Sequence, residues 1–254
     1  MALRIGEAEV VLGTMKNAGV FNGLFVEHRD VAASHAVLRQ AYAAGIRSFD
    51  TAPIYARCHA EADLGACFQD QPEAELWTKV GVDTTTPLPQ LDYSFDGMCR
   101  SLEASLGRLR RPQIVAVLIH NPDLRVVDHQ CIRDFGAWAR EHAKASQIGI
   151  STLYPSQLTS FRLDSADWWA MCEPGRWAGD AGLRREIRSR FRLALRSLFG
   201  GGGMLRHGSV KKRRELMRTA FAEAITLYDP EAIVVGARTG QHLEDLQCCV
   251  AELR

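Results

Sequence analysis

The sequence predicts one eight-stranded parallel α/β barrel, a (β/α)8 or TIM barrel, that occupies residues 1–254 as a single domain. Short apolar runs alternate about eight times with longer amphipathic segments, which is typical of strand–helix units around a parallel sheet. The chain is long enough for one such barrel. Apart from the glycines at 200–203, no linker-like stretch, repeat or low-complexity segment divides it.

The first half of the chain carries the clearer pattern of elements. Strands are predicted at 10–12, closed by Gly13, at 46–51, at 76–80, and at 115–119, closed by His120. Helices are predicted at 31–44, with Asp30 as the N-cap, at 61–68 and at 94–109. The last of these carries apolar residues at helical spacing, which indicates an amphipathic helix.

The second half is predicted from weaker signals. We expect a helix at 132–144, a fifth strand at 148–151, a sixth strand around Trp168 and Trp169, and a seventh at 193–199. A helix at 210–227, an eighth strand at 232–235 and a last helix at 241–253 complete the barrel.

The composition is that of an ordinary globular protein, with 46% hydrophobic and 24% charged residues. A net charge of +1 gives no general attraction to nucleic acid or to anionic membranes. No apolar run reaches the roughly 18 residues that span a bilayer, and the N-terminus lacks the apolar core of a signal peptide. We therefore expect a cytoplasmic protein without a membrane partner.

The cysteines and histidines give no sign of a disulfide framework or a metal site. The 7 cysteines are scattered and none is spaced as C-x-x-C, so we expect reduced thiols. The 8 histidines show no H-E-x-x-H or comparable ligand spacing, so no metal is expected.

Four reactive side chains fall at predicted strand ends or in the loops that follow: Asp50, Tyr55, Lys79 and His120. Barrel enzymes place their chemistry there, and strands two, three and four are neighbours if the strand order is sequential. A lysine ammonium near a tyrosine favours the phenolate and makes the hydroxyl a better proton donor. A carboxylate keeps the lysine charged, and a histidine can polarise a carbonyl. Each residue alone is more often structural, but together they favour a catalytic cluster.

Several motifs resemble those of the aldo-keto reductases. Residues 44–55, A-G-I-R-S-F-D-T-A-P-I-Y, resemble a signature of that family, and E-A-D-L-G at 61–65 resembles the motif that follows it. Thr78-Lys79, the stretch from Ser101-Leu102 to Leu109, and H-N-P-D at 120–123 also match family patterns, and residues 148–151 and 235–238 resemble later strands. The resemblance is dense before residue 152 and thin afterwards.

The resemblance implies a carbonyl reductase that uses a nicotinamide dinucleotide, NADPH more often than NADH. Tyr55 would be the general acid, tuned by Lys79 and Asp50, and His120 would orient the carbonyl of an aldehyde, ketone or keto sugar. The pyrophosphate would lie near the loops after strands seven and eight, where small residues let backbone amides approach an anion.

The resemblance also implies a set of cofactor-binding residues. Arg238, a fixed bidentate cation, and Thr239 stand where relatives hold the adenosine 2′-phosphate. The full set is Gly13, Thr14, Asp50, Ser151, Ser197, Phe199, Gly200, Gly201, Gly202, Arg238, Thr239 and His242.

Departures from the family fall mainly on the nicotinamide contacts. Ser151-Thr152 replaces a common Ser-Asn, and the usual strand-six glutamine is not evident around 168–170. Where many relatives stack a tyrosine on the nicotinamide, this chain has Arg196-Ser197-Leu198. The loop from Tyr55 to Glu61 is longer by about two residues, and the C-terminal loop that closes many relatives' pockets is missing. We therefore expect an open or differently closed pocket, with Met15, Phe21, Trp77 and Trp168 as its candidate lining.

Two alternatives follow from these departures. The same tyrosine, lysine and histidine could perform proton chemistry without hydride transfer, as in a dehydratase or epimerase. The second alternative is a non-catalytic binding subunit, like the potassium-channel β-subunits that share the barrel. About a dozen Lys and Arg lie between residues 183 and 218, and we interpret them as a solvated helix face and phosphate-site cations, not a nucleic-acid surface. The expected partner is a small carbonyl compound, and the expected state a monomer or small homo-oligomer.

Overall fold

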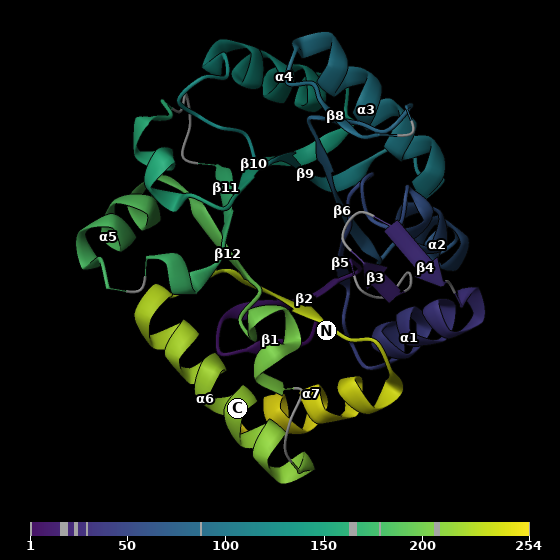
Figure 1. Cartoon of the computed structure of the whole chain (residues 1–254), viewed down its shortest axis with the longest axis vertical. Coiled ribbons are helices and arrows are strands. Elements are labelled where there is room, and N and C mark those ends of the chain that lie inside the picture. Colours follow the sequence, from purple (N-terminus) through teal and green to yellow (C-terminus); the bar gives the residue numbers. More distant parts are fainter. Residues whose placement is uncertain are drawn as a thin grey trace.

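The computed structural model of the chain describes residues 2–15, 20–22, 25–28, 30–86, 88–162, 167–177, 179–205 and 209–253. Eight parallel strands close into a barrel surrounded by helices (Figure 1), which confirms the predicted (β/α)8 fold. Closure comes from β2, which pairs with both β13 and β5. The barrel strands are β2 Ala8–Gly13, β5 Ser48–Asp50, β6 Glu75–Val80, β9 Ile114–His120, β10 Ala145–Thr152, β11 Trp168–Cys172, β12 Arg192–Arg196 and β13 Ala232–Gly236.

The outer layer differs from the prediction at two positions. The α-helices are α1 Val31–Ala43, α2 His59–Phe68, α3 Phe95–Leu109, α4 His129–Glu141, α5 Ala181–Arg190, α6 Val210–Tyr228 and α7 Gly240–Glu252. Helix α5 escaped prediction because it is strongly polar and buries only Ile187, so its sequence contains too few apolar residues to indicate a helix that packs on the barrel. Between β10 and β11, the outer position is held by the 3-10 helix η1, Pro155–Ser160, instead of an α-helix.

Five short strands outside the barrel were not predicted. Strand β1, Arg4–Ile5, pairs antiparallel with β2. One hairpin, β3 Val20–Asn22 with β4 Phe25–His28, follows β2, and another, β7 Val82–Asp83 with β8 Gln90–Leu91, follows β6. Just after β8, the Tyr93 hydroxyl donates to the carbonyl oxygen of His120 at 2.8 Å, which ties this segment to the end of β9.

Alternation along the strands decides which side chains fill the barrel, because successive residues of a strand point to opposite faces. The interior cluster is formed by Val11, Trp77, Ala116, Leu118, Trp169, Met171, Ala194, Ala232 and Val234. Four polar residues lie two positions beyond a member of this cluster, so they are on the same, inner side of the barrel at its mouth. They are Lys79, His120, Glu173 and Arg196.

The sixth strand corrects one predicted pocket residue. Trp168 faces outward and packs under α4, where a Cβ on Gly136 would come within 2.9 Å of its ring. Its neighbour Trp169 is the interior residue, with its ring centroid 4.9 Å from that of Trp77. Of the other candidates, Met15 is 42% exposed, and the side chain of Phe21 lies outside the described part of the structure.

The opposite end of the barrel is closed by a polar network at the starts of β2, β5 and β6. The Ser48 hydroxyl lies 2.6 Å from Glu9 Oε1 and 2.9 Å from Glu75 Oε2. Burial raises the pKa of Glu9, and the neighbouring Glu75 adds to this effect despite the bond from Ser48. The barrel floor is therefore built from carboxyl groups that share hydrogen bonds.

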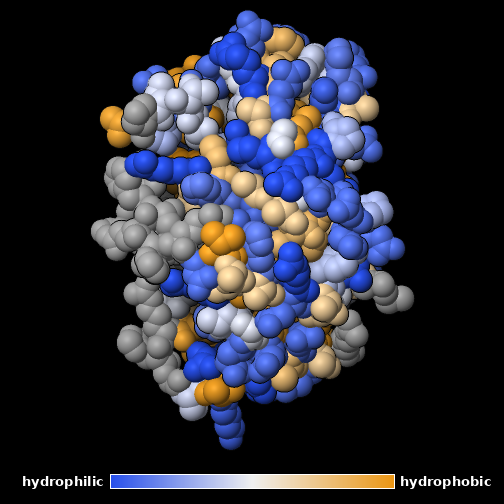
Figure 2. All heavy atoms as spheres, turned by 90° about the vertical axis from the view of Figure 1, so that its right-hand side faces the viewer, coloured by the Kyte–Doolittle hydropathy of each residue, from blue (hydrophilic) through white to orange (hydrophobic). Residues whose placement is uncertain are grey.

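The outer surface is mainly polar. Figure 2 shows the side on which α2 and α3 lie in Figure 1, and there apolar residues form only scattered groups among hydrophilic ones. Many of the basic side chains between 183 and 218 are paired with acids, as Arg188 is with Glu231 and Lys212 with Glu215. None of the described helices has the length and apolar character needed to cross a membrane.

Candidate active site

Lys79 and Asp50 form a buried ion pair at the inner rim of the barrel mouth. The Lys79 Nζ atom lies 2.6 Å from Asp50 Oδ1 and donates to the carbonyl oxygen of Thr51 at 2.8 Å. Lys79 is only 1% exposed and Asp50 4%. Burial lowers the pKa of Lys79, but Asp50 and Tyr55 together outweigh this effect, so that the pKa is raised. These surroundings favour the ammonium form of Lys79 at neutral pH.

Tyr55 lies against this pair, in the loop between β5 and α2. Its ring centroid is 4.9 Å from Lys79 Nζ, and Lys79 also acts on its hydroxyl as a charge and as a hydrogen-bond partner. The next three residues, 56–58, all adopt positive φ, so the longer loop coils tightly at this point. Burial raises the pKa of Tyr55 more than Lys79 lowers it. The charge of Lys79 therefore reduces the rise in the pKa of Tyr55 that burial causes, but the pKa still lies above its ordinary value.

His120 completes the cluster from the end of β9. Its ring stands edge-on to Tyr55, with the ring centroids 6.0 Å apart. Burial, together with the positive charges of Lys79 and Arg196, lowers the pKa of His120 to about 3. The imidazole is thus neutral at physiological pH and can donate one N–H to a carbonyl oxygen.

Polar atoms without partners gather around this cluster. Buried polar atoms are nearly always hydrogen-bonded. Among the described residues, seven buried side-chain atoms are not, and five of these lie in or beside the barrel mouth. The five are Thr14 Oγ1, Thr51 Oγ1, Trp77 Nε1, His120 Nδ1 and Arg196 Nε. The barrel mouth therefore contains several hydrogen-bonding groups that the described residues leave available to a ligand.

The loop after β12 carries one group of the predicted cofactor residues. Ser197 and the glycines at 200–202 adopt positive φ, between 54° and 88°, which only glycine adopts without strain. Ser197 precedes the 3-10 helix η3, Gly200–Leu205, and the three glycines lie within it. Phe199 lies in the same loop, but its ring is buried 5.4 Å from that of Phe221, so its side chain belongs to the core.

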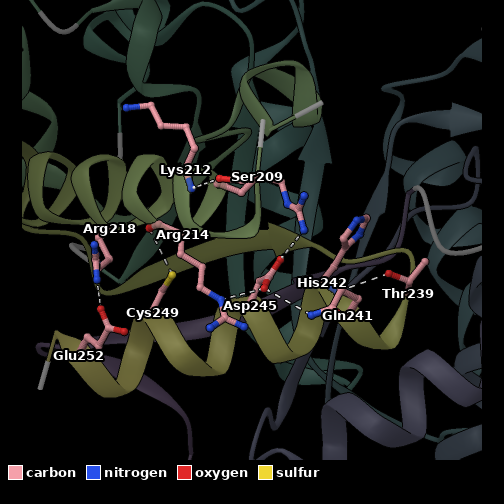
Figure 3. Close-up of polar contacts among 11 residues, drawn as sticks. Ser209, Lys212, Arg214, Arg218, Thr239, Gln241, His242, Asp245, Cys249 and Glu252 are labelled. Atoms are coloured by element: carbon pink, nitrogen blue, oxygen red, sulfur yellow. Dashed lines mark hydrogen bonds and ion pairs between the residues drawn. The ribbon is translucent and has the colours of Figure 1, made fainter. Parts of the chain in front are cut away.

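The second group lies at the N-terminus of α7, beside the first. Thr239 caps this helix, with its Oγ1 accepting from the backbone N–H of His242 at 3.3 Å (Figure 3). The backbone N–H of Arg238 donates to Nδ1 of His242, and the Arg238 side chain is exposed.

The remaining predicted residues lie nearer the barrel mouth. Gly13, at the end of β2, pairs with Gly236 of β13. Thr14 follows it with its backbone N–H donating to the Asp50 carbonyl at 2.8 Å. Ser151 is buried near the end of β10, next to His120 in register. The predicted residues therefore lie around one mouth and the loops that extend it.

Sequence reasoning missed two polar side chains in the mouth. Arg196 Nη1 lies 2.6 Å from Glu173 Oε1, and their side chains are 19% and 26% exposed. Burial raises the pKa of Asp50 and Tyr55, and the positive charge of Arg196 opposes that rise, whereas it adds to the lowering of the pKa of His120. Arg196 had been noted only as a departure from the family. Glu173 and Arg196 can both be identified by counting every second residue from the interior residues of β11 and β12.

An ion cluster joining α6 to α7 was also missed. Asp245 is 2% exposed and accepts from Arg214 Nε at 2.9 Å (Figure 3). It also accepts from Arg213 Nη2 at 3.2 Å. Burial raises the pKa of Asp245, but the two guanidinium groups outweigh it, and the net effect lowers the pKa. This cluster fixes α6 against the helix whose N-terminus carries Thr239.

Comparisons with known proteins match part of the chain closely. The sequence profile of the Aldo/keto reductase family matches residues 9–175. A candidate voltage-gated potassium channel subunit beta from Schizosaccharomyces pombe is 33% identical over 114 residues, which are 43% of this chain and 33% of that protein. Pyridoxal 4-dehydrogenase from Microbacterium luteolum is 32% identical over 130 residues, or 41% and 37% of the two chains.

The chain spans well under half the length of these two curated relatives. Among solved structures, the aldo-keto reductase from Bacillus halodurans in its holo form aligns with a TM-score of 0.77 at 16% identity. That alignment covers 95% of this chain and 86% of the other, and at this identity the likeness establishes the fold.

Proposed function

This chain belongs to the aldo/keto reductase family, and on that premise we propose that it is an NAD(P)H-dependent reductase of a small aldehyde, ketone or keto sugar. The observation that carries the proposal is the buried Lys79–Asp50 pair beside Tyr55 and His120, surrounded by polar atoms without partners. We expect the enzyme to meet its substrate in the cytoplasm, as a monomer or small homo-oligomer.

The cluster suits protonation of a carbonyl oxygen. Tyr55 keeps its proton at neutral pH because burial raises its pKa, so the hydroxyl is available as a donor. As the proton leaves, the phenolate that forms is stabilised by the Lys79 ammonium, which Asp50 holds charged and oriented. Neutral His120 donates an N–H to the same oxygen and fixes the carbonyl before transfer. The nicotinamide cofactor, when bound, supplies the hydride to the carbonyl carbon.

The residues present fit such a cofactor. The Thr14 hydroxyl is buried without a partner. The positive-φ glycines after β12 place no Cβ atom in the way of an approaching phosphate, and the amides of Gly200 and Gly202 hold the loop in shape by donating to the carbonyls of Ser197 and Phe199. The N-terminus of the 13-residue helix α7 offers backbone amides and a favourable dipole for a phosphate. We assign the 2′-phosphate to Arg238 with Thr239, which makes NADPH the preferred cofactor and NADH the alternative.

Titration of the purified protein with NADPH and NADH, followed by tryptophan fluorescence, tests the proposal. We expect saturable binding, tighter for NADPH. If neither dinucleotide binds, the reductase proposal is wrong, and the barrel performs proton chemistry such as dehydration or epimerisation. This second function is kept as an alternative because Glu173 and Arg196 occupy the mouth of a chain that lacks the family's usual nicotinamide contacts.

The variant Tyr55→Phe tests the role of the acid. We expect its turnover of carbonyl substrates to fall by about 10²- to 10⁴-fold, because the proton donor is lost, while the affinity for NADPH stays within about twofold. Undiminished turnover would remove Tyr55 from the mechanism. A wild-type protein that binds NADPH but turns over no carbonyl compound would favour a binding subunit.

A further inference from the structure

The barrel mouth has two halves that carry different side chains. Strands β5, β6 and β9, with the loop after β5, supply Asp50, Lys79, His120 and Tyr55, here called the acid–base half. Strands β10, β11 and β12 lead to Ser151, Glu173 and Arg196, here called the far half. Within the far half, Glu173 and Arg196 form the ion pair that the proposed chemistry has not used.

The proposed reaction requires the nicotinamide ring to lie in the barrel mouth, beside the carbonyl group that Tyr55 protonates. Tyr55 protonates the carbonyl oxygen, and the hydride must reach the carbon bonded to that oxygen, with reacting atoms about 3–3.5 Å apart. The proposed phosphate loops follow β12 and β13. A dinucleotide bound at those loops starts beside the end of β12, where Arg196 stands, and Glu173 follows the neighbouring strand β11.

The ion pair is complementary to a primary carboxamide, which has one carbonyl acceptor and two N–H donors. The Arg196 guanidinium has five N–H donors; its Nη1 contacts Glu173 and its buried Nε has no partner. A carboxylate accepts about four hydrogen bonds, so Glu173 can accept an amide N–H in addition to its present partners. Resting on the proposed function, we propose that the Glu173–Arg196 pair holds the nicotinamide carboxamide, with Arg196 donating to its oxygen and Glu173 accepting from its NH2 group.

This assignment has an electrostatic consequence. The oxidised nicotinamide ring carries a positive charge, whereas the reduced ring is neutral. The intact pair has no net charge and discriminates little between them. Glu173→Gln leaves the Arg196 charge beside the ring, which disfavours the oxidised cofactor. Arg196→Met leaves the Glu173 charge, which favours it.

The experiment measures dissociation constants of NADP+, NADPH and 2′-phospho-ADP-ribose, which lacks the nicotinamide, for each variant. Both single variants should bind NADPH at least about tenfold more weakly, yet bind the truncated ligand within about twofold of wild type. The ratio of Kd for NADP+ to Kd for NADPH should rise in Glu173→Gln and fall in Arg196→Met. Arg192→Met is the matched control, because Arg192 lies on the same strand near the barrel floor, 4.2 Å from the ring of Trp169.

Equal losses for the full and truncated ligands, or ratios that do not move in opposite directions, would overturn this assignment. So would a loss confined to the KM of the carbonyl substrate, which would make the pair a substrate contact. If either single variant fails to fold, the doubly neutral Glu173→Gln/Arg196→Gln variant replaces it. It should keep the wild-type ratio, because its two amides add no charge. Failure of the wild type to bind either dinucleotide would instead overturn the proposed function.

Discussion

The two halves of the barrel mouth hold their charges in different ways. In the acid–base half, Lys79 is 1% exposed and donates to both Asp50 and the Thr51 carbonyl. In the far half, Arg196 and Glu173 keep 19% and 26% of their side-chain surface exposed, and Arg196 Nε has no partner. The proton-transfer groups are thus fixed inside the fold, whereas the recognition groups stand at its rim. Changes at the rim can alter binding without unfolding the barrel.

The largest difference between the halves should appear in stability. Lys79→Met leaves Asp50 as a buried charge without its partner, and we expect a loss of about 3–5 kcal/mol in the free energy of unfolding. Arg196→Met should cost less than about 2 kcal/mol, because water reaches Glu173. Urea unfolding of both variants measures this comparison, and equal losses would contradict it. Adding Asp50→Asn to Lys79→Met should recover most of the stability but not the turnover.

A second prediction concerns acid. The folded protein keeps His120 neutral down to a pKa of about 3, whereas the unfolded chain takes up the proton near pH 6.5. Between these values the unfolded state binds more protons, so the His120 contribution is complete above pH 6.5 and is lost as the pH falls. The loss reaches up to about 2 kcal/mol at pH 5.

The variant His120→Asn isolates that contribution, because asparagine does not titrate. Unfolding free energies of wild type and variant, measured from pH 7 to pH 4, should show a smaller decline with acid in the variant. Parallel profiles would mean that the imidazole is not held neutral by its surroundings in the acid–base half.

The smallest predicted effect lies outside both halves, at the end of β13. Arg238→Ala should weaken NADPH binding by about tenfold, or 1.4 kcal/mol, and leave NADH binding nearly unchanged, because only NADPH carries the 2′-phosphate. Lys211→Ala, an exposed cation on α6, is the control for general charge effects. Fluorescence titration measures both, and equal losses for the two cofactors would show that Arg238 does not contact the 2′-phosphate.

Sequence was most informative where one short motif carries both a strand and its polar end. Asp50 closes an apolar run and Tyr55 follows five residues later, so the acid–base half could be predicted before the fold was known. Strand β11 shows why the far half could not. Its sequence W-W-A-M-C is apolar on both faces because helices cover one side and the barrel interior fills the other. Without an alternation of apolar and polar residues, the sequence does not show which side chains of β11 point into the barrel. The prediction therefore placed Trp168 on the wrong face.

For the same reason, the sequence does not show that Glu173 and Arg196 lie on the inner side of the barrel. Which residues of β11 and β12 point inward becomes clear only once the interior cluster that contains Met171 and Ala194 is known. Helix α5 was missed for a different reason, since a strongly polar helix that buries one side chain contains few apolar residues from which a buried face can be recognised. A helix or strand of this chain can therefore be predicted from the sequence when one of its faces is buried and the other is exposed.

Two buried groups at opposite ends of the barrel respond to acid with opposite signs. At the floor, the Ser48 hydroxyl has one hydrogen and lies between two carboxyl groups, so it can donate to only one of them at a time. Because burial raises the pKa of Glu9, acidification favours the folded state through that group, while it disfavours the folded state through His120 in the mouth. The Glu9 contribution therefore offsets part of the stability that His120 loses as the pH falls.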